Sequence, residues 1–532
     1  MKKIFCFIIT LLLTLSLSSC KSSSKNITND KGEIIGIKRD LKFIPDKDSF
    51  FKSKSSNLST YFFDGGIPYV SVLDYIKAID YYNKEVIVSD DNNYRFVTNG
   101  YNKHIKLDYE NNQFIIYDFE IFPVDEKQYL LDSNYNKNLL LTIDEVDEDI
   151  MSVINLDEYN LKLEQADDKV LIPFHIINAF FSIDSYYYVY YTGNKYFGYS
   201  LADGKTNPNI IKKDEVQLKF SPEYAEYNFN FLNLVFNEFY GLRYYDKNNL
   251  GEILNLNKSI YLDENSYLVQ TKKFIASLND NHTSISLSDL ITRDDVSSYN
   301  STRAYYRNNL RTRLLSAQTT QRYMNTTSSY MLIDDKTAVI PFYEFSMEKD
   351  RNTAQSVALC LDELDSLGVE NIIFDVTLNG GGDTFSLAQI LGLMTNNDIV
   401  LDFINIRNNH YSKEIFKVDS DFDGDFSDDD AYTQFNYYVF SSEYTYSCAN
   451  DFVHYCKKYN LAKTIGKKTG GGACCIAPVV TPTGALIVMS GLYGIKDSSN
   501  DLIEYGVDVD YEIDYENFYK NDYFLAAINS FN

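Results

Sequence analysis

The feature that most constrains the fold of this chain is an alternation of apolar strands and amphipathic helices in its second half. The pattern predicts strands at 338–345, 371–376 and 437–441 and helices at 353–367, 385–394 and 448–459. Parallel strands need crossover connections, which are usually helices, so this order predicts a mostly parallel sheet with helices on its faces. The first helix is expected to turn four leucines inward: Leu359, Leu361, Leu364 and Leu367. Ligand sites in such a sheet lie at the carboxyl ends of the strands.

A run of glycines, Asn379-Gly380-Gly381-Gly382, follows the strand at 371–376. Glycines lack a Cβ and let backbone N–H groups approach a ligand closely, and the helix that begins next favours negative charge at its N-terminus. A phosphate-binding Walker loop would need a following Gly-Lys-Ser/Thr, which is missing. The turn therefore predicts an oxyanion hole, with a tight turn that binds no ligand as the alternative.

Ser447 lies in a second strand-to-helix turn, Thr445-Tyr446-Ser447-Cys448-Ala449-Asn450. A serine in such a turn exposes its Oγ in the positive field of the helix end, which suits a nucleophile. Serine is also a favoured helix N-cap, which is the simpler interpretation. Cys448 is an alternative nucleophile, but it lies one residue inside the turn and is expected to contribute its backbone N–H.

A nucleophilic serine needs a base, and the chain has five histidines. His454 lies two helical turns after Ser447, roughly 10 Å away, which is too far for a direct hydrogen bond. His104, His175 and His410 lie outside polar clusters. His282 follows a predicted helix at 265–278 on the polar loop Asp280-Asn281-His282-Thr283 and is the preferred candidate.

Four ordered segments of the chain resemble motifs of the S41 family of serine peptidases. They are Asn379–Gly382 (Asp-Leu-Arg-x-Asn-x-Gly-Gly in the family), Thr445–Asn450 (Thr-Ala-Ser-Ala-Ala-Glu), Ile465–Gly472 (Ile-Gly-Glu-x-Thr-x-Gly) and Ile503–Asp510 (Glu-x-Gly-Val-x-Pro-Asp). The resemblance covers about 222–532. It implies an α/β catalytic domain of the crotonase/ClpP-like type with a helical lead-in, which hydrolyses peptide bonds through an acyl-enzyme.

One departure from the family pattern indicates the subtype. The processing peptidases of the family use a Ser–Lys dyad, and Gly472 stands where that lysine would be. The His282 loop resembles instead the tricorn-like branch, which uses serine, histidine and glutamate. The resemblance then implies Ser447 as nucleophile, His282 as general base and acid, and Glu504 orienting the imidazole directly or through Asn281. It also implies an oxyanion hole of Gly381 and Cys448, with Gly382 as a further donor, and no cofactor for catalysis.

An acidic segment at 419–430 matches the spacing of a calcium loop. Its candidate ligands are Asp419, Asp421, Asp423, Asp425 and Asp430, with Gly424 and Ser427 at loop positions 6 and 9. Asp430 replaces the usual final Glu, and its shorter side chain predicts a weaker site. The alternative is a solvated acidic loop.

The N-terminus carries an export signal. Lys2 and Lys3 precede an apolar run at 4–17, which is shorter than the ~20 residues of a membrane-spanning helix. Leu17-Ser18-Ser19-Cys20 resembles the lipobox of bacterial lipoproteins, which implies lipidation of Cys20 and an extracytoplasmic, lipid-anchored chain; an ordinary secretory signal is the alternative. We predict a signal peptide at 1–20 and a linker at 21–35, with 22–25 as a flexible tether.

Between the linker and the peptidase region, 36–205 shows short alternating strands separated by turns, which predicts a smaller α+β accessory module. Segments 66–72 and 170–191 resemble each other and suggest a duplication. A turn-rich boundary at 203–208 precedes a peptidase domain at 215–532. Within it, five arginines on the polar stretch 286–329 are expected to form a solvated face or, alternatively, to meet a substrate carboxylate: Arg303, Arg307, Arg311, Arg313 and Arg322.

Charge and cysteine content limit the partners. The formal net charge of −26 argues against nucleic-acid binding, so peptides or proteins and a membrane surface are the expected partners. Five cysteines remain after Cys6 and Cys20, and one disulfide among Cys448, Cys474 and Cys475 stays open. Two alternatives to a peptidase are a non-catalytic peptide or small-ligand binder on the same fold, and a surface scaffold whose first module carries the function.

Overall fold

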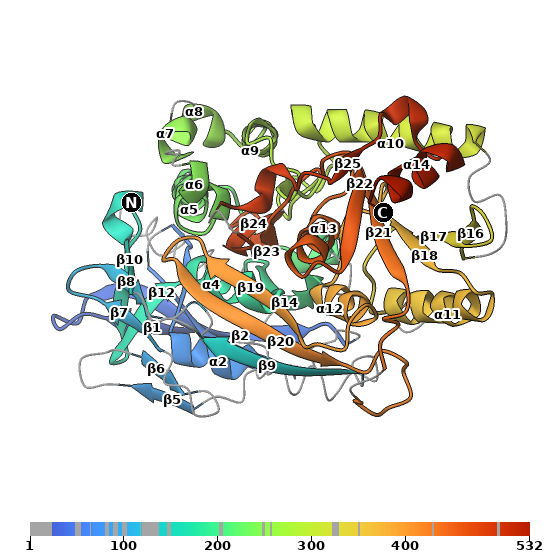
Figure 1. The fold of residues 1–532 in the computed structure, drawn as a ribbon. Helices are drawn as coiled ribbons and strands as arrows, with labels where there is room; N and C mark the ends of the chain where they lie inside the picture. Colours follow the sequence, from blue (N-terminus) through green and yellow to red (C-terminus); the bar gives the residue numbers. More distant parts are fainter. Residues whose placement is uncertain are drawn as a thin grey trace, which may run out of the picture.

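A computed structural model shows how these segments are arranged (Figure 1). It describes residues 24–531, apart from gaps at 48–54, 64, 80–84, 89–93, 98–103, 118, 120–137, 146–150, 202–205, 247–249, 256–257, 322–328, 349–351, 428–429 and 497–500. The signal peptide and Cys20 lie outside the described residues. Among the residues it does describe, none of the helices combines the length and the apolar character needed to cross a bilayer.

A six-stranded sheet forms the centre of the C-terminal half. Its order is β16 (Met331–Leu332), β17 (Thr337–Pro341), β18 (Asn371–Asp375), β21 (Asn436–Ser441), β22 (Ala462–Gly466) and β25 (Tyr511–Glu512). All strands from β17 to β25 pair in parallel, and only the edge strand β16 is antiparallel. The prediction of a mostly parallel sheet is therefore confirmed.

Helices cover both faces of this sheet (Figure 1). One face packs on α11 (Thr353–Ser366), α12 (Thr384–Gly392) and α13 (Cys448–Lys458) through side chains that include Phe374 and Val439. The other face uses the alternate residues, including Ile373 and Phe440, against α10 (Thr302–Thr320) and α14 (Asn521–Phe531). This alternation is the period of two expected of a strand that is buried on both sides.

The prediction for the leucines of α11 is half wrong. Leu361 and Leu364 are buried, whereas Leu359 is 66% and Leu367 54% exposed. Successive helical residues are about 100° apart, so Leu359 lies on the face opposite Leu361. Leu367 is the C-cap residue, beyond the last turn of the helix.

A second sheet lies beside the first and includes a strand from the predicted accessory module. Its order is β15 (Ser284–Ile285), β24 (Leu486–Gly494), β19 (Ile399–Asn405), β20 (His410–Val418) and β9 (Leu139–Glu145), with β23 (Cys474–Val480) also paired to β24. Because β9 pairs along its whole length with β20, the N-terminal and C-terminal regions share this sheet.

Two further sheets build the N-terminal region. The larger contains β11 (Glu164–Ala166), β12 (Lys169–Pro173), β4 (Pro68–Val70), β3 (Ser56–Phe62), β2 (Ile34–Pro45), β14 (Lys195–Ser200) and β13 (Tyr187–Tyr191), with β1 (Ser24–Thr28) paired to β2. The smaller contains β10 (Ser152–Asn155), β8 (Gln113–Ile116), β7 (His104–Asp108), β6 (Tyr94–Val97) and β5 (Glu85–Val88). Within the predicted linker at 21–35 and tether at 22–25, the described residues 24–28 form strand β1, whose main chain bonds to β2, and 21–23 lie outside the described residues.

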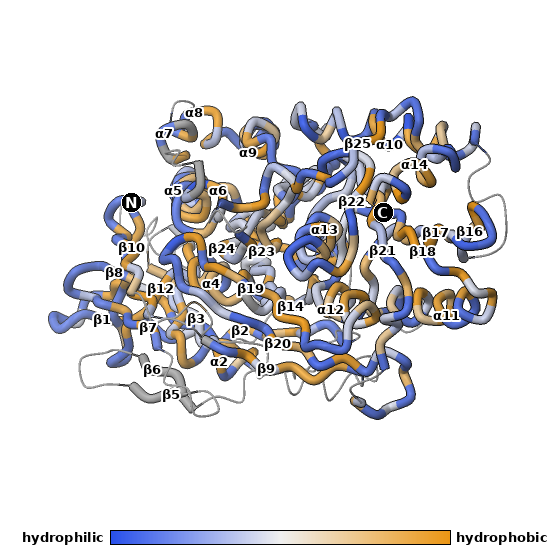
Figure 2. Tube along the Cα trace, viewed as in Figure 1, coloured by the Kyte–Doolittle hydropathy of each residue, from blue (hydrophilic) through white to orange (hydrophobic). Residues whose placement is uncertain are grey.

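Seven further α-helices lie among the described residues. They are α2 (Val72–Ile79), α4 (Phe174–Ser185), α5 (Pro222–Glu238), α6 (Gly241–Asp246), α7 (Leu250–Asn255), α8 (Lys258–Tyr261) and α9 (Tyr267–Ser277). One hydrophobic cluster joins side chains of α4, α5 and β23, and Figure 2 shows hydrophobic residues along interior elements such as α4 and β19. The helical lead-in therefore packs against both halves of the chain.

Candidate active site

Ser447 occupies a strained main-chain position between β21 and α13. Its φ of 58° and ψ of −133° lie outside the regions that L-residues ordinarily occupy. The surrounding main chain holds it there, because Ser447 N–H donates to Gly471 O at 2.9 Å and Asp451 N–H donates to Ser447 O at 3.0 Å. Strain of this kind persists only where the surroundings over-determine it, and it is common at active sites.

The glycine turn after β18 packs directly against Ser447. Because β18 and β21 are neighbouring parallel strands, their carboxyl ends meet, and Tyr446 N–H donates to Asn379 O at 3.2 Å. Gly381 has a φ of 111°, and a Cβ on it would lie 2.6 Å from Ser447 Cβ and 2.9 Å from Tyr446 O. The close approach of the two turns thus requires glycine at 381.

Two backbone N–H groups beside Ser447 are available to an incoming oxygen. In the described part of the chain, the N–H groups of Gly382 and Cys448 have no main-chain acceptor, and the main chain of Gly382 also bonds to the Cys448 thiol. The N–H of Gly381, which the sequence placed in the oxyanion hole, instead donates to Asn379 Oδ1 at 2.9 Å. Asn379 therefore fixes the glycine turn, and the N–H groups of Gly382 and Cys448 remain as candidate donors to a ligand.

The structure argues against Cys448 as the nucleophile. Its side chain is buried, its Sγ donates to Gly382 O at 3.0 Å, and burial raises the pKa of the thiol well above its usual value. A thiol in this state is neither accessible nor ionised. Among the described residues the structure contains no disulfide, and Cys448 and Cys474 are both buried thiols.

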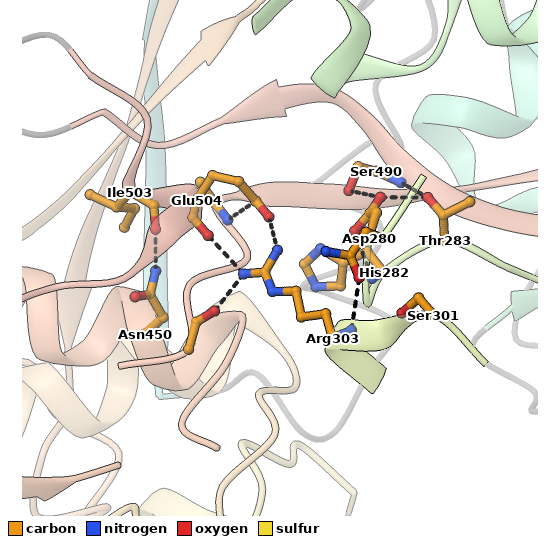
Figure 3. Close-up of polar contacts among 12 residues, drawn as sticks. Asp280, His282, Thr283, Ser301, Arg303, Asn450, Ser490, Ile503 and Glu504 are labelled. Carbon is orange, nitrogen blue, oxygen red and sulfur yellow. Dashed lines mark hydrogen bonds and ion pairs between the residues drawn. The ribbon is translucent and has the colours of Figure 1, made fainter. Parts of the chain in front are cut away.

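His282 reaches the nucleophile turn from the loop between α9 and β15. Its ring packs against Tyr446, the residue directly before Ser447, with 4.8 Å between the ring centroids. The loop is anchored by the buried Asp280, which accepts from His282 N–H (2.9 Å), Thr283 Oγ1 (2.5 Å) and Ser490 Oγ (2.8 Å) (Figure 3). Asp280 thus fixes the backbone that carries the imidazole.

The environment of His282 keeps its imidazole neutral. Burial is the main cause that lowers its pKa, to about 4, and the positive charges of Arg303 and Arg307 act in the same direction. Within the described residues, His282 Nδ1 and both amide atoms of Asn281 are buried without a hydrogen-bond partner, and no hydrogen bond joins the ring to Ser447. A neutral imidazole can accept a proton, and hydrogen bonds at such sites are often loose before substrate binds.

Glu504 lies at the same site, but Arg303 binds its carboxylate. Arg303 Nη1 donates to Glu504 Oε1 at 2.9 Å, and Ala473 N–H donates to Glu504 Oε2 at 2.9 Å (Figure 3). Only 1% of the Glu504 side chain is exposed. Burial, assisted by the negative charge of Asp280, raises the pKa of Glu504 to about 7 even though Arg303 opposes the shift.

Arg303 is the functional candidate that the sequence did not single out. Its other amino group bridges Gly470 O (2.5 Å) and Glu504 O (3.0 Å), and its guanidinium lies 5.4 Å from the centre of the Tyr446 ring. Arg307 stacks on Tyr446 from the same helix and donates to Tyr444 O. The solvated-face prediction is therefore wrong for these two arginines, while Arg311 and Arg313 are exposed and Arg322 lies outside the described residues.

Asn450 connects the remaining motif segments to the start of α13. Its Nδ2 donates to Ile503 O at 3.3 Å (Figure 3), and its Oδ1 accepts from Thr469 Oγ1 at 2.6 Å. Thr469 Oγ1 also accepts from Val507 N–H. These bonds explain how the segments 465–472 and 503–507 come to lie beside Ser447.

The position of the dyad lysine is closed by Tyr446. Gly472 has a φ of 89°, and a Cβ on it would lie 2.5 Å from the Tyr446 ring. No side chain at 472 could extend toward Ser447 unless Tyr446 moved. The ring that fills this space is also the one that supports His282.

A cavity of about 520 Å³ opens beside the glycine turn. Its lining includes Arg311, Leu315, Tyr343, Leu378, Gly381 and Tyr444. The walls are mainly apolar and aromatic, and Arg311 and Glu344 add one cationic and one anionic group. A groove of this composition can hold a peptide side chain.

The predicted calcium residues lie away from this site and are only partly assembled. Asp419, Asp421 and Asp423 come together. Asp430 instead accepts from the main chain and side chain of Ser427, and Asp425 lies outside the cluster.

Residues 336–513 match the family model for Peptidase family S41. This match covers about a third of the chain, and the remaining residues lie outside it. The matched residues include the glycine turn, Ser447 and Glu504, whereas His282 and Arg303 precede them. No curated protein matches the chain.

Three solved structures that match this chain have low sequence identity and TM-scores below 0.5. A candidate peptidase from Parabacteroides merdae is 19% identical, covers 58% of this chain and 96% of its own, and has a TM-score of 0.44. A lipoprotein from Streptococcus agalactiae is 13% identical over 59% of this chain and 98% of its own, with a TM-score of 0.37. The tricorn protease is 11% identical over 95% of this chain and 59% of its own, with a TM-score of 0.32.

Proposed function

We propose that this protein is a serine peptidase that hydrolyses peptide bonds through an acyl-enzyme on Ser447. The observation that carries the proposal is the strained main chain of Ser447, beside two N–H groups that have no main-chain acceptor among the described residues, within a region that matches Peptidase family S41. In this proposal Ser447 supplies a hydroxyl, and Gly382 and Cys448 supply two oxyanion donors. These are the two requirements of acyl transfer.

In the proposed reaction, Ser447 Oγ attacks the carbonyl carbon of the scissile bond while the neutral imidazole of His282 accepts its proton. The N–H groups of Gly382 and Cys448 stabilise the negative charge on the carbonyl oxygen. The tetrahedral intermediate then expels the amine, which takes the proton from His282. Water, deprotonated by His282, hydrolyses the ester and restores Ser447.

Glu504 is proposed to stabilise the imidazolium by its charge, with Arg303 as the positioning residue. The ion pair with Arg303, whose guanidinium lies 5.4 Å from the centre of the Tyr446 ring, holds the carboxylate at a fixed place. It also keeps the pKa of Glu504 lower than burial alone would leave it. More of the carboxyl is therefore ionised at neutral pH when His282 becomes charged.

Peptides or proteins are the proposed substrates, and the cavity lined by Leu315, Tyr343 and Leu378 is the proposed site for a substrate side chain. Lipid anchoring through Cys20 outside the cytoplasm is proposed from the lipobox alone. Replacement of Cys20 by serine should move the protein from the membrane fraction to the soluble fraction, and unchanged membrane association would contradict the anchor.

The decisive experiment uses a fluorophosphonate probe and a peptide library on the purified protein. We expect labelling and cleavage by the wild type, no labelling of Ser447→Ala, and unchanged behaviour of Ser316→Ala, an exposed serine on α10. Equal cleavage by the wild type and Ser447→Ala would refute the assignment. A folded Ser447→Ala protein, checked by its melting temperature, ensures that the loss is chemical.

A non-catalytic peptide binder is the second candidate. It is favoured by the carboxylate of Glu504, which bonds to Arg303 and Ala473 and makes no contact with the imidazole of His282 in the described structure. This candidate predicts that the wild type binds library peptides without cleaving them. Binding by both the wild type and Ser447→Ala, with no probe labelling, would decide in its favour.

A further inference from the structure

The loop between β20 and β21 carries a cluster of carboxylates outside the candidate active site. Asp419, Asp421 and Asp423 each present a carboxylate oxygen, and these three oxygens all lie within 4.8 Å of one another. Asp419 is fully buried, whereas Asp421 and Asp423 are exposed. The cluster therefore has a closed side formed by the protein and an open side that faces solvent.

The buried carboxylate of Asp419 is incompletely satisfied. Its Oδ2 accepts from Asn138 Nδ2 at 2.5 Å and from Gly424 N–H at 3.0 Å. Its Oδ1 is buried and has no hydrogen-bond partner among the described residues. A buried carboxylate oxygen normally has a donor or a metal ion, because burial without one is costly. Here its nearest charged neighbours are two further carboxylates, which increase that cost.

We propose that this loop binds a calcium ion through Asp419, Asp421 and Asp423. Calcium takes six to eight oxygen ligands at about 2.3–2.6 Å, so oxygens up to ~5 Å apart can share one ion. The cluster offers only carboxylates, which favours a hard cation over zinc or copper. Water completes the coordination from the open side. Asp430 is not a ligand, since Ser427 holds its carboxylate.

The loop that carries these ligands bonds to two other parts of the fold. Asp419 N–H donates to Asn138 O at 3.0 Å, which ties the loop to the residue before β9. Ser420 Oγ donates to Gly392 O at 2.9 Å, at the end of α12. Because α12 begins at the glycine turn, the ion stabilises the far end of the helix that supports the oxyanion donors.

Calcium binding is measured directly on the purified full chain after treatment with a chelator. Calorimetry with CaCl₂ should give saturable heat, and a large excess of CaCl₂ should raise the melting temperature by about 2–5 °C. Neither readout depends on peptidase activity. No heat and an unchanged melting temperature would overturn the proposal.

Two variants separate the site from general charge effects. Asp421→Asn combined with Asp423→Asn should abolish both responses, while Asp398→Asn, an exposed aspartate outside the cluster, should retain them. In chelator the double variant should melt at or above the wild-type temperature, because repulsion with Asp419 is removed. A double variant that still responds to calcium would overturn the proposal, and an equal response of the wild type to MgCl₂ would overturn the choice of calcium.

Discussion

The nucleophile side and the acid–base side of the candidate active site are built by different means. Ser447, Gly381 and Cys448 are held by main-chain bonds between neighbouring parallel strands and their turns. His282, Glu504 and Arg303 come from three distant segments and are held by side-chain contacts. The main-chain bonds leave little room for Ser447 to change position. The side chains of His282, Glu504 and Arg303 can change their hydrogen-bond partners.

This difference shows in the hydrogen bonds. On the Ser447 side the main chain is strained at Ser447, and a Cβ on Gly381 would lie 2.6 Å from Ser447 Cβ. On the acid–base side Glu504 bonds to Arg303 and Ala473, and the imidazole has no bond to Ser447 in the described structure. We infer that substrate binding acts mainly on the acid–base side.

The largest expected effect comes from a clash on the nucleophile side. Gly381→Ala would place a Cβ 2.6 Å from Ser447 Cβ and 3.1 Å from Cys448 N, which displaces the oxyanion donors. We expect kcat/KM to fall about 10²–10³-fold, the usual cost of losing one such donor. Gly380→Ala is the matched control, because no atom lies within 4 Å of its Cβ position. Equal activity of the two variants would contradict the packing of the turns.

The sequence predicts the part of the site that local features build, and it does not predict the contacts between distant segments. The strands that precede Gly380 and Ser447 were located to within a residue or two, because their apolar pattern and the turns are local features. The sequence does not separate Arg303 from four other arginines, because its partner Glu504 is 201 residues away and α10 lies in a polar stretch that buries only a few side chains, such as Leu310 and Leu314. No local signal separates such an arginine from a solvated one.

Replacement of Arg303 tests the acid–base side. Arg303→Gln removes the ion pair and both bonds to the main chain of Gly470 and Glu504, so the carboxylate loses its position. We expect kcat/KM to fall about 10–100-fold, in the range that misplacement of a catalytic group produces. Arg313→Gln, on the exposed side of α10, should change it by less than about twofold. Equal losses for both variants would indicate only a general charge effect.

The pH profile sharpens the comparison further. His282 must be neutral to accept a proton, and its pKa of about 4 places the acid limb of kcat/KM near pH 4. Ionisation of Glu504, with a pKa of about 7, should add a further rise through pH 7. Because Arg303 lowers both pKa values, Arg303→Gln should shift both limbs to higher pH. A single limb near pH 6.5 that Arg303→Gln leaves unchanged would contradict this electrostatic description.

The smallest expected effect concerns the hydroxyl of Tyr446, the residue that joins the two sides. Its ring supports His282 and fills the space above Gly472, while its hydroxyl is buried without a partner in the described structure. Tyr446→Phe keeps the ring, so we expect kcat/KM within about threefold of the wild type and no loss of stability. Tyr446→Leu removes the ring contact and should cost more, about tenfold, because the imidazole is held less firmly. A loss of more than about 100-fold in Tyr446→Phe, measured beside its melting temperature, would instead give the hydroxyl a direct part in the reaction.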